Sequence, residues 1–219
     1  MALGVTTLVD ALADQLREII VSGELAPGER ITEQAVADRY AVARPTAKAA
    51  IERVVQIGIL RRTANKTAVV PELTAEDIED LYRVRLLLEH SVVKHLAQRR
   101  TAPSAAYSAL DDMKRSIEQG EFASAVDSDF RFHVALVTTV GSPRLLRTYQ
   151  TLMGEGQLCM ARERSASRFQ AFPNYEDHVA IIGAIASGAV KEAQRLMVAH
   201  FVNAVDRILG KPLDTKGWI

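Results

Sequence analysis

Cysteine, aromatic residues and long apolar runs are all scarce in this sequence, and each shortage excludes a class of protein. A single cysteine, Cys159, among 219 residues leaves no partner for an internal disulfide and fits a reducing, cytoplasmic location. No apolar run approaches the roughly 20 residues of a membrane-spanning helix, so we expect no membrane partner. Aromatic residues make up 5% of the chain and alanine is frequent, which favours helices over sheets.

Positive and negative charges balance over the whole chain but not along it. Residues 39–70 hold seven basic residues and one acid, Glu52, which gives a local charge of +6. Residues 1–38 hold two basic residues and seven acids, which gives a local charge of −5. A basic segment within a neutral chain predicts a contact surface for DNA, although a solvated basic face would give the same pattern.

The basic segment has the pattern of a helix-turn-helix followed by a β-hairpin. Thr32 is placed to cap a first helix, residues 41–43 form a tight connection, and Pro45 suits the start of a second helix. Apolar residues at helical spacing continue that second helix until Gly58. Two short strand-like runs then flank a predicted hairpin tip at residues 64–66.

This arrangement predicts two kinds of DNA contact. Arg44 and Lys48 lie one turn apart at the start of the second helix and project from one face, as in helices that enter the major groove. Basic side chains of the hairpin are placed to bind phosphates or the minor groove. The predicted DNA-binding residues are Gln34, Arg44, Pro45, Thr46, Lys48, Arg61, Arg62 and Lys66.

The rest of the chain carries only helical patterns. Six amphipathic segments with short connections predict an antiparallel bundle; they cover residues 75–99, 103–120, 121–140, 143–165, 174–187 and 189–209. In the fourth segment we expect Gly154 and Gly156 to interrupt the helix. The prediction is a mostly α protein with a winged helix-turn-helix domain (1–70), a linker (71–75), an all-helical domain (76–209) and a tail (210–219).

Four polar residues lie on the apolar faces of these predicted helices. Asp129 and His133 are one turn apart in the third segment, and His178 and His200 lie at similar depths on either side of a turn near Gly188. Burial of such groups without partners costs about 1–3 kcal/mol each, so each needs a partner. One carboxylate and three imidazoles form a ligand set for Zn²⁺ or another divalent transition metal. Separate, hydrogen-bonded core histidines are the alternative.

Arg85 lies on the apolar face of the first bundle segment. An arginine stays charged, so on a buried face it needs an anion. That anion is either the carboxylate of a small ligand or an internal acid such as Glu89, one turn further on.

Part of the basic segment and the residues before it resemble the winged-helix domain of GntR-family transcription regulators. The matching stretches are Leu16-Arg17-Glu18, the run Ser-Gly-Glu-Leu-Ala-Pro-Gly-Glu-Arg-Ile at residues 22–31, and Val42-Ala43-Arg44. Arg44 matches the family pattern, whereas Lys48 replaces an arginine and Gln34 a basic residue. The resemblance implies binding to double-stranded DNA. Lysine lacks the bidentate fork of arginine, so we expect weaker base discrimination at Lys48.

The helical segments resemble the FCD ligand-binding domain of the FadR subfamily. Asp129-Phe130-Arg131-Phe132-His133 is similar to its Asp-x-x-x-His element, and His178 and His200 match its other two metal positions. Val84-Arg85-Leu86-Leu87-Leu88-Glu89 is similar to its Val/Leu-Arg-x-x-Leu-Glu pattern. This resemblance implies that Arg85 faces the carboxylate of an effector.

Together these features predict a transcription regulator rather than an enzyme. We expect a repressor-type homodimer that binds a pseudo-palindromic operator and senses a small organic acid. Its metal is expected to be Zn²⁺, with Ni²⁺ or Mn²⁺ also compatible with the ligand set. Two alternatives stay open: a DNA-binding protein whose metal site is purely structural, and a metal-dependent enzyme that activates water.

Overall fold

The computed structural model describes residues 7–64, 67–165, 175–214 and 218. The first part, here called the winged-helix unit, runs to Val70 and holds three helices among its described residues: α1 (Leu8–Val21), α2 (Glu33–Tyr40) and α3 (Arg44–Gln56). Thr7 caps α1 in a reciprocal capping box with Asp10, and Thr32 caps α2. Helix α3 begins one residue before the predicted Pro45, which takes its second position.

A three-stranded antiparallel sheet completes the winged-helix unit. The predicted hairpin forms from β2 (Arg61–Arg62) and β3 (Ala68–Val69), and β1 (Arg30–Ile31) pairs with the other edge of β3. Strand β1 was not predicted from the sequence, because a two-residue strand has no periodicity and forms only by pairing with a distant partner.

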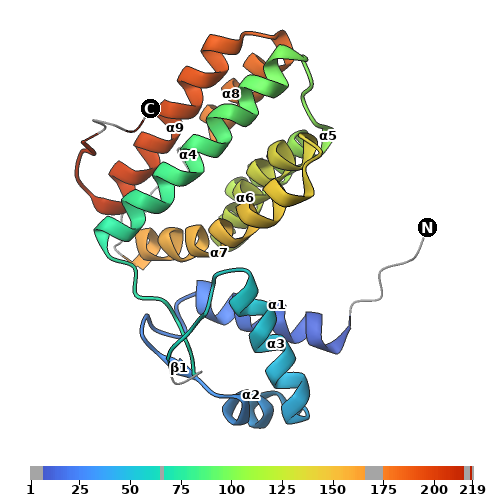
Figure 1. The fold of residues 1–219 in the computed structure, drawn as a ribbon, viewed down its shortest axis with the longest axis vertical. Coiled ribbons are helices and arrows are strands. Elements are labelled where there is room, and N and C mark those ends of the chain that lie inside the picture. Colours follow the sequence, from blue (N-terminus) through green and yellow to red (C-terminus); the bar gives the residue numbers. More distant parts are fainter. Residues whose placement is uncertain (1–6, 65–66, 166–174, 215–217, 219) are drawn as a thin grey trace.

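The second part, here called the bundle, contains the six predicted helices, so the predicted fold class is confirmed. They are α4 (Ala75–Gln98), α5 (Ser104–Gln119), α6 (Phe122–Thr139), α7 (Pro143–Ser165), α8 (Tyr175–Ser187) and α9 (Val190–Leu209). Thr74 caps α4 in a second capping box, with Asp77. Figure 1 shows α7 as the bundle helix that faces the winged-helix unit, beside α1. Within the described ranges, none of the helices combines the length and the apolar character that a membrane crossing needs.

Two sequence expectations for the bundle were wrong. Gly154 and Gly156 do not interrupt α7, which is one continuous helix, because close tertiary contacts at both glycines outweigh their low helix propensity. The segment after α9 is not a free tail among its described residues. Trp218 is buried in the bundle core, and the Leu213 N–H donates to Asp206 Oδ1 at 2.6 Å.

Candidate metal centre and DNA-binding surface

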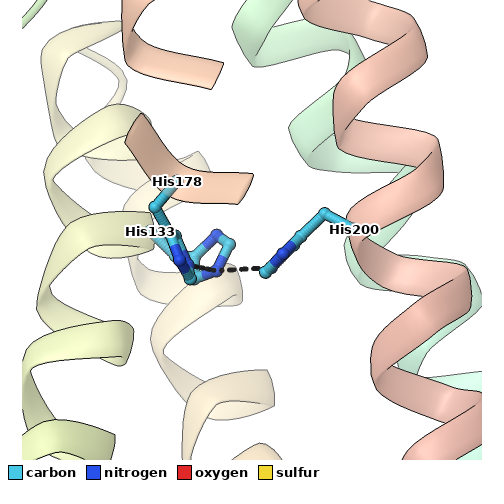
Figure 2. Close-up of side chains that lie close together, drawn as sticks. All are labelled: His133, His178 and His200. Atoms are coloured by element: carbon cyan, nitrogen blue, oxygen red, sulfur yellow. Dashed lines mark hydrogen bonds between the residues drawn. The ribbon is translucent and has the colours of Figure 1, made fainter. Parts of the chain in front are cut away.

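Three buried histidines meet inside the bundle. His133 comes from α6, His178 from α8 and His200 from α9, and their rings converge as Figure 2 shows. His133 Nε2 lies 3.2 Å from His178 Nε2 and 3.3 Å from His200 Nε2. Two ligand atoms about 2.1 Å from one metal ion, at angles of roughly 90–109°, lie about 3.0–3.4 Å apart. The spacing therefore fits ligands of a shared divalent cation.

The three rings face one another through their Nε2 atoms. His133 Nδ1 lies 2.5 Å from Glu89 Oε2 and donates to this carboxylate, which directs Nε2 toward the other two rings. The Nε2 atoms of both His178 and His200 lie within reach of His133 Nε2. A cation bound to all three Nε2 atoms would account for their convergence, which favours the metal site over separately hydrogen-bonded core histidines.

Asp129 lies beside the cluster of three histidines, next to His178, and is not one of the group whose ligand atoms all lie within 4.8 Å of one another. Its Oδ1 is 3.1 Å from His178 Nε2, and no aligned hydrogen-bond donor for Oδ1 occurs among the described residues. Burial by itself raises the pKa of the Asp129 carboxyl, but contact with His178 and the nearby imidazoles of His133 and His200 lower it below its ordinary value. The group is thus an anion at neutral pH, as a metal-binding carboxylate must be.

His200 is held neutral. Burial and the nearby His178 lower the pKa of its imidazole to about 4, although Asp177 Oδ2 lies 3.5 Å from Nδ1 and acts in the opposite direction. A neutral imidazole whose Nδ1 faces a carboxylate can present a lone pair on Nε2 toward the centre of the cluster.

Glu89 is a further candidate site residue, which was not predicted as such from the sequence. It is fully buried on α4, where His133 Nδ1 and the Tyr149 hydroxyl both donate to it. Burial raises the pKa of the Glu89 carboxyl, but the charge and hydrogen bond of His133 together with Arg85 lower it overall. A carboxylate that orients a metal-binding histidine is a common supporting element of metal sites. The available sequence signal was its place one turn after Arg85 on the same apolar face.

Arg85 is buried beside this carboxylate. Its Nη2 lies 3.5 Å from Glu89 Oε1, so the internal ion pair considered as an alternative does form. The guanidinium carbon also lies 4.8–5.6 Å from the ring centres of Tyr82, Phe130 and Phe201. Nε has no hydrogen-bond partner among the described residues, so part of its donor capacity is unused.

The start of α3 presents the predicted base-contacting residues on the surface. Arg44, Pro45 and Lys48 are exposed and Thr46 is half-buried. Arg44 Nε lies 3.1 Å from Glu33 Oε2 on α2, and the exposed Gln34 donates to Asp38 at 2.8 Å. These contacts hold the predicted helix-turn-helix side chains against α2.

The hairpin arginines are both paired with acids. Arg61 Nη2 lies 3.2 Å from Glu155 Oε2 on α7, and Arg62 pairs with Glu52 on α3. Lys66 lies outside the described residues.

Comparison with known proteins assigns both parts of the chain. The family profile of the FCD domain matches residues 80–203, and that of bacterial regulatory proteins of the gntR family matches residues 8–70. The chain belongs to the GntR family. With its FCD domain this GntR regulator has the FadR-like architecture, so it is a DNA-binding transcription regulator.

Relatives of this GntR regulator agree over most of their length. It is 29% identical to the Nta operon transcriptional regulator of Aminobacter aminovorans, over 86% of this chain and 89% of that protein. It is 26% identical to a gluconate operon transcriptional repressor of Bacillus licheniformis, over 93% of this chain and 84% of that protein. A crystal structure of a GntR regulator from Rhodococcus sp. RHA1 superposes with a TM-score of 0.77 at 25% identity, covering 92% of this chain and 97% of that one.

Proposed function

We propose that this GntR regulator is a repressor whose bundle holds a divalent transition metal, most favourably Zn²⁺, and senses a small organic acid. The proposed ligands are Asp129, His133, His178 and His200, and Arg85 is the proposed contact of the effector carboxylate. The observation that carries the proposal is the convergence of three buried Nε2 atoms at 3.2–3.3 Å around His133.

Charge in the buried cluster supports an anionic effector. With neutral imidazoles, the charges of Arg85, Glu89 and Asp129 sum to −1. A bound divalent cation would make the cluster net positive and supply open coordination positions, and a monocarboxylate would then neutralise it. The unused Nε–H of Arg85 is a donor available to such a group.

The DNA side of the proposal follows from the winged-helix unit. We propose that two copies form a homodimer whose α3 helices bind the half-sites of a pseudo-palindromic operator. The repressor assignment is supported by the gluconate operon repressor, with which the chain shares most of its length. An effector that binds one orientation of the two units more tightly must change DNA affinity by linkage.

The test is the metal content of the purified protein. Wild type is expected to carry about one transition metal per chain, and the double variant His178→Ala with His200→Ala is expected to lose it. His95→Ala, which changes a histidine of α4 outside the cluster, is the matched control and should keep the metal. Circular dichroism of each variant checks that the helices are retained.

Effector binding is then tested on the metal-loaded protein. A series of carboxylic acids should raise the melting temperature of wild type but not of Arg85→Lys, which keeps the charge but loses the fork-shaped donor set. A wild type that neither contains nor takes up a transition metal would contradict the proposal and leave only the DNA-binding assignment.

A further inference from the structure

One face of α7 carries the contact between the bundle and the winged-helix unit. This docking face consists of Thr151, Gly154, Glu155 and Leu158. Leu158 packs against the core of the winged-helix unit rather than that of the bundle. Figure 1 shows the turn after α3 reaching up to this face of α7.

Main chain meets main chain at the centre of the docking face. A Cβ atom placed on Gly154 would lie 1.7 Å from the carbonyl oxygen of Ile57, which no side chain tolerates. A Cβ atom on Gly58 would lie 2.5 Å from the carbonyl oxygen of Thr151, and Gly58 has φ +83° in the left-handed region. Because both residues are glycines without a Cβ atom, the main chains of α7 and of the turn after α3 can approach this closely.

The approach also determines where Arg61 lies. This residue follows the turn directly, and its guanidinium is paired with Glu155 of the docking face at 3.2 Å. A half-exposed ion pair of this kind contributes little by itself. The glycine contact supplies the rigid placement, because it fixes the backbone on both sides of the pair.

We propose that docking of the winged-helix unit on this face of α7 is an autoinhibitory contact that withholds Arg61 from DNA phosphates. In the docked arrangement the hairpin binds DNA without the phosphate contact of Arg61. When the contact opens, Arg61 joins the DNA-binding surface and affinity rises. This device needs no metal and no effector, so it stands apart from the proposal for the histidine cluster.

A double-mutant cycle between Arg61 and Glu155 tests the device. Phosphate contacts are independent of sequence, so a mixed-sequence DNA duplex is a sufficient probe, and each contact contributes about 0.9 to the slope of log affinity against log salt. Glu155→Gln should steepen the slope by about 0.9 relative to wild type. Arg61→Ala should lower the slope less in the wild-type background than in the Glu155→Gln background, where it should remove that gain.

Removal of a negative charge also strengthens DNA binding nonspecifically, so a matched control is needed. Glu192 on α9 pairs with Arg195 at 2.6 Å, far along the chain from the docking face. Glu192→Gln should leave the slope unchanged. Equal losses on Arg61→Ala in both backgrounds would show that Arg61 already contacts DNA in wild type, and would overturn the proposal.

Gly154→Ala tests the contact without changing any charge. The added methyl group must push Ile57 away, so the variant should show the steeper slope of Glu155→Gln. It should also show faster hydrogen exchange at residues 57–60. Gly183→Ala is the control, because a Cβ on this α8 glycine meets nothing within 4 Å. Unchanged exchange and an unchanged slope in Gly154→Ala would overturn the proposal.

Discussion

The winged-helix unit and the bundle bury different kinds of residue. The core of the winged-helix unit contains apolar side chains such as Leu16, Ile51 and Leu60. Among the described residues, every buried polar or charged side chain lies in the bundle. Among the described residues, the winged-helix unit therefore keeps its charged and polar side chains out of its core, whereas the bundle buries several of them.

This difference separates folding stability from the proposed function in the first part and joins the two in the second. A surface arginine can be exchanged with little effect on folding. A buried charge is tolerated only while its partners remain, because an unpaired ion in the interior loses its solvation without compensation. Substitutions in the two parts should consequently fail in different ways.

The largest expected effect is at Arg85. Arg85→Leu leaves Glu89 and Asp129 as buried anions without a compensating cation in the metal-free protein. The expected loss is about 3–5 kcal/mol in the free energy of unfolding, measured by urea denaturation. Arg83→Leu, an exposed arginine on the same helix, should change it by less than about 0.5 kcal/mol. Equal effects of the two substitutions would show that the bundle interior does not depend on charge balance.

The next effect is a loss of stability in acid. Folded His200 stays neutral down to about pH 4, because burial lowers its pKa, whereas in the unfolded chain it takes up a proton below about pH 6.5. Its contribution is thus complete above pH 6.5 and is lost as the pH falls toward 4. It amounts to about 3 kcal/mol at most.

Urea denaturation of the metal-free protein at several pH values measures this loss. His200→Gln, which cannot titrate, should flatten the profile between pH 6.5 and 4. A variant with the wild-type profile would assign the acid sensitivity to other groups.

The smallest effect on folding, with a clear effect on function, is expected at Arg44. Arg44→Ala should weaken binding to an operator selected with the wild-type protein by about 1–3 kcal/mol, since an arginine contact to a base is lost. The free energy of unfolding should change by less than about 0.5 kcal/mol. Arg99→Ala, on the bundle surface, is the control for loss of one positive charge. Wild-type affinity in Arg44→Ala would remove this residue from the recognition surface.

The features that were predicted best from the sequence are those that depend on neighbouring residues. Helical spacing and caps such as Thr32 and Thr74 located the helices, because capping depends on neighbouring residues. The approach of His178 and His200 was predicted by counting residues from the turn between their helices, and the structure places both against His133.

Two contacts between residues far apart in the chain could not be predicted from the sequence. Glu89 gains its role only when α6 brings His133 to α4, and nothing in the spacing of residues 89 and 133 indicates that meeting. Gly154 was expected to break a helix, because propensity is local and the contact with Ile57 is not. Propensity was thus outweighed by tertiary packing.

Helix α7 contacts the bundle with one side and the winged-helix unit with another, so its helical turn determines how these two contacts are oriented. Tyr149 projects into the bundle and donates to Glu89, while Gly154, five residues later, meets the winged-helix unit. Each residue added to a helix turns everything beyond it by about 100°. The insertion of one residue between Tyr149 and Gly154 would leave the residues that make both contacts unchanged. It would nevertheless turn one of the two contacts away from its partner. The length of this short stretch is therefore as constrained as its residues.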